Sequence, residues 1–129
     1  MKVYPVFKKT QTTQPSFGYS SPLKTDFKNG LIKLEKGVYG GSLKRKKNAS
    51  LDHIIPKSKG GTSDIYNYFL SNKIMNMARG NRPLKDFIKL EQFLEYLSAM
   101  LEVKTKNIDG VDYCKGMIKN VLKALKEGL

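Results

Sequence analysis

The sequence has 129 residues, 40% of them hydrophobic, which suffices for one modest core but not for two independent ones. Its 24 Lys and Arg residues against 11 Asp and Glu residues give a formal net charge of +13, and such an excess predicts a polyanionic partner. With one cysteine and one histidine, the chain can form neither an internal disulfide nor a zinc finger. No stretch approaches the length of a membrane span, so we expect a cytoplasmic (intracellular) protein without membrane association.

The positive charge is concentrated in the first two thirds of the chain. Residues 1–85 carry 17 Lys and Arg against 4 Asp and Glu, whereas residues 86–129 carry 7 of each. This asymmetry indicates a phosphate backbone as the partner of the first part, with DNA expected and RNA open as an alternative. A solvated basic surface without a ligand and a face for an acidic protein are the competing interpretations.

Residues 1–30 are rich in Ser, Thr, Gly and Pro, a composition that predicts an irregular basic arm rather than a packed element. Aromatic and basic residues alternate along it, and such an arm would suit a nucleic-acid groove. The other interpretation is a segment that its aromatic residues fix to the core. The residues concerned are Lys2, Tyr4, Phe7, Lys8, Lys9, Phe17, Tyr19, Lys24 and Lys28.

Residues 31–56 contain short strand signals on both sides of a basic run. Apolar residues in 31–41 predict strand or irregular pieces, and 51–56 reads as a compact strand that Pro56 ends. Four consecutive cations stand between them and directly precede the Asp52-His53 pair. We expect this run to contact phosphate rather than to form only a solvated turn. It comprises Lys44, Arg45, Lys46 and Lys47.

A loop and a helix are predicted to follow. Residues 57–64 form a loop in which Gly60 and Gly61 supply backbone freedom. From Asp64 the apolar pattern becomes helical and continues to a glycine terminator at Gly80. The central part of the chain is therefore expected to run strand, strand, loop, helix.

Two further helices are predicted over 84–104 and 110–127, as an antiparallel pair packed on the central unit. Their apolar stripes are expected to face the core, with Cys114 a small buried hydrophobe. A leftover stripe would suit a dimer, so the expected state is a monomer or a homodimer. The first stripe comprises Phe87, Leu90, Phe93, Leu94, Leu97 and Leu101, and the second comprises Val111, Cys114, Ile118, Val121, Leu122 and Leu125.

The polar residues of 50–83 form a set suited to phosphodiester hydrolysis. A strand end places Asp52 and His53 on opposite faces, and helical spacing brings Asn76 close to Asn72 and Arg79. A neutral imidazole suits a general base, and carboxylate and amide oxygens suit a divalent cation such as Mg²⁺. Arg79 is expected to brace a phosphate.

The stretch Leu51–Pro83 resembles the HNH endonuclease family, whose fold is the ββα-metal unit. The matching residues run from Asp52-His53-Ile54-Ile55-Pro56 through Ser58-Lys59-Gly60-Gly61 and Asn67 to Asn76 and Arg79-Gly80. The resemblance implies that His53 is the general base and that Asn67 bridges the loop. It also implies that Asp52 and Asn76 hold one Mg²⁺ or Mn²⁺ ion. The final metal position, usually His, is Asn in this H-N-N version.

Many relatives carry two cysteine pairs that bind a structural zinc, and here these positions fall at residues 39–42 and at Asn72 and Met75. No structural zinc is therefore expected, and the C-terminal helices must supply the missing stability. The small size and isolated motif point, by resemblance, to a phage or mobile-element protein.

The expected architecture is α+β, with an arm (1–30), a ββα-metal core (31–83) and a C-terminal helical pair (84–129). The expected function is metal-dependent hydrolysis of DNA, and the alternative is a non-catalytic nucleic-acid-binding module on the same scaffold. His53, Asn67 and Arg79 are the candidate catalytic residues, and Asp52 and Asn76 are the candidate metal ligands. The candidate nucleic-acid contacts are Lys44, Arg45, Lys46, Lys47, Lys57, Lys59, Lys73 and Arg82.

Overall fold

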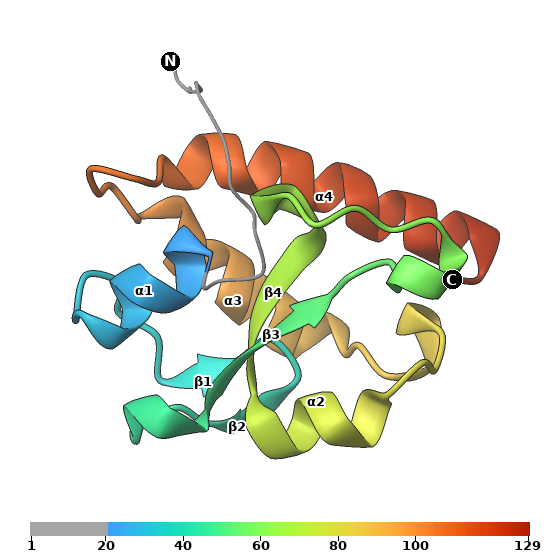
Figure 1. The fold of residues 1–129 in the computed structure, drawn as a ribbon, viewed down its shortest axis with the longest axis horizontal. Coiled ribbons are helices and arrows are strands. Elements are labelled where there is room, and N and C mark those ends of the chain that lie inside the picture. The colour runs from blue at the N-terminus through green and yellow to red at the C-terminus, as the bar shows by residue number, and fades with distance from the viewer. Residues whose placement is uncertain (1–20) are drawn as a thin grey trace.

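Two small antiparallel sheets and four α-helices make up residues 21–129 of the computed structural model, the part of the chain that the structure describes. The fold class is α+β, as predicted. In Figure 1 the hairpin of β3 and β4 lies between α2 at one end of the view and α4 at the other. No helix among these residues is long and apolar enough to cross a membrane.

The central hairpin pairs β3 (Ala49–His53) with β4 (Tyr68–Asn72), from Ala49 opposite Asn72 to His53 opposite Tyr68. The prediction of a helix starting at Asp64 is therefore wrong over the first half of that segment. Residues 65–67 form a 3₁₀ turn, and the next five residues form a strand. Tyr, Phe and Leu in succession suit a buried strand, and the hydrogen bonds of β3 decide between strand and helix.

Helix α2 (Lys73–Arg79) begins directly after β4. Asn72 caps it, because its side-chain oxygen accepts hydrogen bonds from the backbone N–H groups of Ile74 (2.9 Å) and Met75 (3.2 Å). Gly80 follows with a positive φ of 54° and ends the helix. The order strand, loop, strand, helix thus occupies residues 49–79.

A second hairpin, β1 (Lys36–Gly37) with β2 (Gly40–Ser42), lies against β4. The backbone N–H of Val38 donates to Leu70 O at 3.1 Å. A Cβ at Gly37 would stand 2.6 Å from the backbone N of Asn72, so the two backbones meet here without room for a side chain. Residues 31–41 therefore contain short strand pieces, as predicted.

Helix α1 (Pro22–Lys28) corrects the prediction that residues 1–30 are irregular throughout. Its proline stands in the first turn, where the missing N–H costs nothing, and Leu23 and Phe27 stand one turn apart and are both fully buried. The remainder of the predicted arm, residues 1–20, lies outside the described residues.

Helix α3 (Leu90–Leu101) is shorter at both ends than the predicted 84–104, and α4 (Gly110–Glu127) has the predicted bounds 110–127. They run side by side in opposite directions (Figure 1). The predicted apolar stripes were partly wrong. Tyr96 and Met100 of α3 face the core with Tyr113, Cys114, Met117, Val121 and Ala124 of α4, whereas Leu90, Leu94, Leu101, Val111, Leu122 and Leu125 are exposed.

A chain of hydrogen bonds ties these helices to β4. The backbone N–H of Leu70 donates to the hydroxyl of Tyr96 at 2.9 Å, the hydroxyls of Tyr96 and Tyr113 lie 2.9 Å apart, and Tyr113 donates to Tyr68 O at 2.6 Å. Burial raises the pKa of both tyrosines, so they stay protonated and able to donate. The two tyrosine hydroxyls and the backbone N–H of Val38 thereby satisfy polar groups on the edge of β4 away from β3.

Candidate active site

His53 ends β3 and faces a cavity of about 320 Å³. The cavity is lined by Asp52, His53, Pro56, Lys57, Ser58, Gly80 and Asn81. The imidazole lies against the ring of Tyr68, its partner on β4, with ring centroids 4.6 Å apart. Its Nε2 atom is buried and has no hydrogen-bond partner among residues 21–129.

The environment keeps this histidine neutral. Burial lowers the pKa of His53 from its ordinary value, and the charge of Lys57 acts in the same direction against the attraction of Asp52. At neutral pH the imidazole is therefore unprotonated and has one free lone pair. That is the state in which a histidine can accept a proton.

Asp52 points to the other side of β3 and is buried, with 6% of its surface exposed. Its Oδ2 atom lies 2.9 Å from Arg79 Nη1 and also accepts a hydrogen bond from the Tyr39 hydroxyl. Burial raises the pKa of the Asp52 carboxyl, although the Tyr39 hydrogen bond and the Arg79 charge oppose this. The pKa of Tyr39 is also raised, mainly by burial, so the phenol remains a donor.

Arg79 is not placed to brace a phosphate, in contrast to the prediction. Only 1% of its surface is exposed, and its Nε, Nη1 and Nη2 atoms all donate within the protein. Besides Asp52 and Tyr39, the acceptors are the carbonyl oxygens of His53 (2.8 Å), Ile54 (3.0 Å) and Arg82 (3.1 Å). Arg79 thus fixes the end of β3 to the end of α2 and neutralises the buried carboxylate.

Asn67 bridges the loop that follows β3. Its side-chain oxygen accepts from the N–H of Ile55 at 3.0 Å, and its amide nitrogen donates to Ile55 O (3.0 Å) and Thr62 O (2.8 Å). The resemblance implied this bridging position. A Cβ at Gly61 would stand 1.8 Å from Ile55 O, so the loop also needs a glycine at this point.

The side chains of Asn76 and Asn72 have different hydrogen-bond partners and do not share a site. The amide nitrogen of Asn76 donates to Ser50 Oγ (2.9 Å) and Leu51 O (3.1 Å), which places this side chain on the β3 face of α2. Asn72 caps α2 and donates to Ser42 O at 2.9 Å. Asn72 thereby joins the start of α2 to the end of β2.

The side-chain oxygens of Asp52 and Asn76 are the candidate ligands of a divalent cation. Among residues 21–129, neither Oδ1 of Asp52 nor Oδ1 of Asn76 takes part in a hydrogen bond, and hard oxygen donors of this kind suit Mg²⁺ and Mn²⁺. No group of three or more His, Cys, Asp or Glu side chains in the described range could hold a metal ion. Both oxygens are of the chemical type that such an ion prefers, and water and phosphate would have to supply the rest of its shell.

The basic residues predicted to contact nucleic acid are all exposed. Lys57 lines the His53 cavity, and Lys59 donates to Asn81 O at 3.5 Å, across the cavity mouth. Lys46 has a structural contact too, because its Nζ donates to Phe27 O at 3.0 Å. Lys44, Arg45 and Lys47 lie beside it, and Lys73 and Arg82 flank the two ends of α2.

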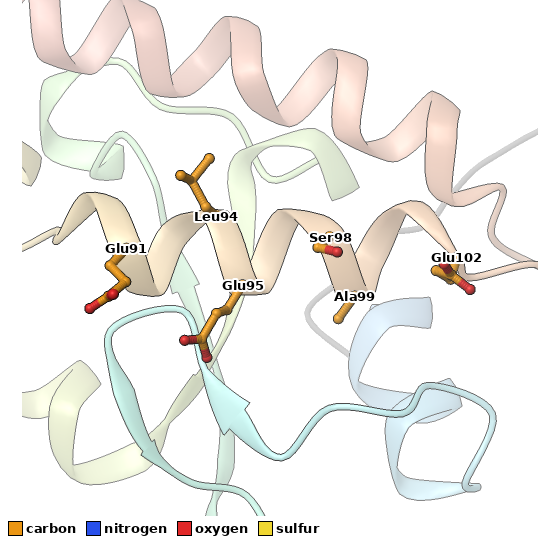
Figure 2. A pocket seen from close by; sticks show the side chains of 6 residues that line it. All are labelled: Glu91, Leu94, Glu95, Ser98, Ala99 and Glu102. Carbon is orange, nitrogen blue, oxygen red and sulfur yellow. The ribbon is translucent and has the colours of Figure 1, made fainter.

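A larger hollow, about 600 Å³, lies along α3 and contains none of the predicted site residues. Figure 2 shows its lining side chains spaced along this one helix. Three of them are glutamates, Glu91, Glu95 and Glu102, and residues 90–102 contain no Lys or Arg. This surface repels phosphate, so size alone does not identify the functional site.

Three residues of the site were missed from the sequence. Tyr39 contacts Asp52 and Arg79, Ser50 holds Asn76, and Tyr68 packs on His53. Recognising residues 68–72 as a strand opposite 49–53 would have found Tyr68. No local signal marks Tyr39 or Ser50.

No protein-family model matches the sequence, and the searches of curated proteins and of solved structures found no match either.

Proposed function

We propose that the protein is a metal-dependent endonuclease that hydrolyses phosphodiester bonds in DNA, with a ββα-metal core of the HNH type. The observation that carries the proposal is the unit β3–loop–β4–α2. It holds a neutral His53 at the mouth of a cavity, Asp52 behind it, Asn67 across the loop and Asn76 on the following helix. The motif residues quoted from the sequence thus share one small structural unit.

His53 acts as the general base. Because Nε2 is buried, we assign to Nδ1 the role of taking the proton of the attacking water. The Asn67 bridge and the Arg79 hydrogen bond to His53 O hold the backbone on both sides of the ring in place. Lys57 and Lys59 attract the phosphate to the cavity, and the charge of Lys57 helps to keep the imidazole neutral.

Asp52 and Asn76 would hold one Mg²⁺ or Mn²⁺ ion through their free oxygens. Such an ion supplies Lewis acidity for the charge that develops on the phosphate and the leaving oxygen. Arg79 keeps Asp52 ionised and oriented from the opposite side, since its guanidinium contacts only Oδ2. Its role is positioning, not contact with the substrate.

Cleavage of supercoiled, linear and branched DNA with Mg²⁺ or Mn²⁺ tests this function, with RNA in parallel. We expect wild-type protein to cut and His53→Ala to lose cutting while keeping its circular dichroism spectrum. Asn81→Ala is the matched control, because this exposed residue lines the same cavity but contributes no acid or base. Full activity of His53→Ala, or an inactive wild type with every divalent metal, contradicts the proposal.

The second candidate is a nucleic-acid-binding module without catalysis. The burial of Asp52, with one oxygen already shared by Arg79 and Tyr39, favours it, because a carboxylate so neutralised attracts a second cation less strongly. Such a module would bind DNA with a steep salt dependence and with equal affinity in Mg²⁺ and in EDTA. The nuclease instead gains affinity or activity from the metal.

A further inference from the structure

The outer face of α2 carries the two most exposed of the exposed large hydrophobic side chains in residues 21–129. Ile74 is 73% exposed and Met77 is 76% exposed. They stand three positions apart, so their Cβ atoms lie about 5–6 Å from each other on one face of the helix. Asn76 and Arg79 occupy the opposite face, toward β3.

The charged residues around this pair favour a polyanion as its binding partner. Residues 65–85 contain four Lys and Arg and no Asp or Glu, and Lys73 and Arg82 flank the pair. The exposed leucines of α3 contrast with it, since Leu90 and Leu94 stand among glutamates. A symmetric dimer through α2 would place Lys73 and Arg82 of both copies at one interface, and like charges disfavour that contact.

We propose that Ile74 and Met77 form an apolar wedge that enters bound DNA and unstacks a base step beside the scissile phosphate. Apolar side chains on basic surfaces commonly enter DNA in this way and kink the duplex. This role rests on the nuclease function proposed above, because α2 also carries the candidate metal ligand Asn76. Unstacking a base step would increase the local spacing of the DNA backbone and give His53 access to one phosphate.

Unstacking can be measured without cleavage. Wild-type protein in EDTA is titrated with a duplex that carries 2-aminopurine at several positions, and the fluorescence of this base rises when it leaves the stack. Fluorescence anisotropy of an end-labelled copy of the same duplex gives the affinity. The variant is Ile74→Ala combined with Met77→Ala, and the matched control is Leu90→Ala combined with Leu94→Ala on α3, which also removes two exposed apolar side chains.

We expect the 2-aminopurine signal to rise with wild type and with the α3 control, and the rise to be lost in the α2 variant. The affinity of the α2 variant should stay within about tenfold of wild type, because phosphate contacts dominate binding. An equal rise in the α2 variant, no rise with wild type, or no DNA binding overturns the wedge. So does a change of molecular mass in the α2 variant, which would assign the pair to a contact between copies.

The nuclease proposal and the wedge proposal can be contradicted independently of each other. If wild type unstacks the duplex in EDTA but does not cut it with any divalent metal, the wedge stands and the catalytic function falls. If wild type cuts without a fluorescence rise, the catalytic function stands and the wedge falls.

Discussion

Arg79 Nη1 lies 2.9 Å from Asp52 Oδ2, and both side chains are buried at the junction of α2 and β3. The pair unites the two halves of the candidate site, because Arg79 also donates to the carbonyl oxygens of His53 and Ile54. A residue expected to contact substrate is therefore part of the internal framework.

Replacing Arg79 by Met should strongly destabilise the protein. The substitution leaves Asp52 buried without its counter-charge, which typically costs about 3–5 kcal/mol in the free energy of unfolding. Urea unfolding measures the effect. Arg82→Met is the control, since Arg82 is exposed and contributes only backbone atoms to its hydrogen bonds with Arg79. Equal stability of the two variants would show that the ion pair contributes little to the free energy of unfolding.

Asn67→Ala should open the loop that follows β3. Ile55 would lose the partners of both its N–H and its C=O, and each buried unpaired group costs about 1–3 kcal/mol. Asn67→Asp keeps the acceptor for Ile55 N–H but buries a carboxylate oxygen against Ile55 O and Thr62 O, so it should unfold at a urea concentration no higher than that of Asn67→Ala. If both variants unfold with the wild-type midpoint, the bridge does not stabilise the loop.

The pKa of His53 should lie below 6.5, and it can be read directly by NMR because the chain has one histidine. A nuclease that needs the neutral imidazole gains activity as the pH rises through this pKa, so its acid limb should fall below pH 6.5. Removing a nearby positive charge with Lys57→Ala should raise the pKa. Lys59→Ala is the comparison, and a lower pKa in Lys57→Ala would contradict the assignment.

The same shift links His53 to stability, with a definite sign. The unfolded chain holds the proton more tightly than the folded protein does, so the free energy of unfolding falls as the pH drops from 6.5 through the folded pKa. His53→Ala removes this part of the pH dependence. Urea midpoints measured at several pH values check the change.

Tyr113→Phe should destabilise the protein by about 1–3 kcal/mol, because the partly buried Tyr68 O loses its donor and the buried Tyr96 hydroxyl loses a partner. Thermal unfolding measures the loss. Tyr66→Phe is the control, since its hydroxyl bonds to Asp112 at the surface, where water can replace the lost partner. A larger loss in Tyr66→Phe would contradict the importance of the tyrosine chain.

The sequence predicted the elements of the motif better than the strand and side chains that hold them in place. The strand predicted over 51–56 and found at Ala49–His53, the loop around Gly60-Gly61 and the end of α2 at Gly80 carry local signals, namely apolar runs bounded by Pro and Gly. The strand at Tyr68–Asn72 carries no such signal, because a short apolar run fits a helix equally well until a partner strand is known.

The buried faces of α3 and α4 also could not be predicted from local sequence patterns. Leu90 and Leu94 have the spacing of a core stripe, yet Tyr96 and Met100 take the core positions. The hydroxyl of Tyr96 decides this, since it can be buried only where Leu70 N–H and Tyr113 provide partners. Those partners are distant in the sequence, so no local pattern reveals them. The burial of Arg79 has the same origin, because its acceptors other than Arg82 O come from 25 to 40 positions away.

The hydrogen bond from Leu70 to Tyr96 also determines how the amide of Leu70 exchanges with deuterium. Tyr96 is fully buried under α4, so solvent reaches this amide only when α3 and α4 leave the hairpin together. The Leu70 amide, placed in the strand beside His53, therefore reports the opening of the C-terminal helices rather than fraying of the hairpin itself.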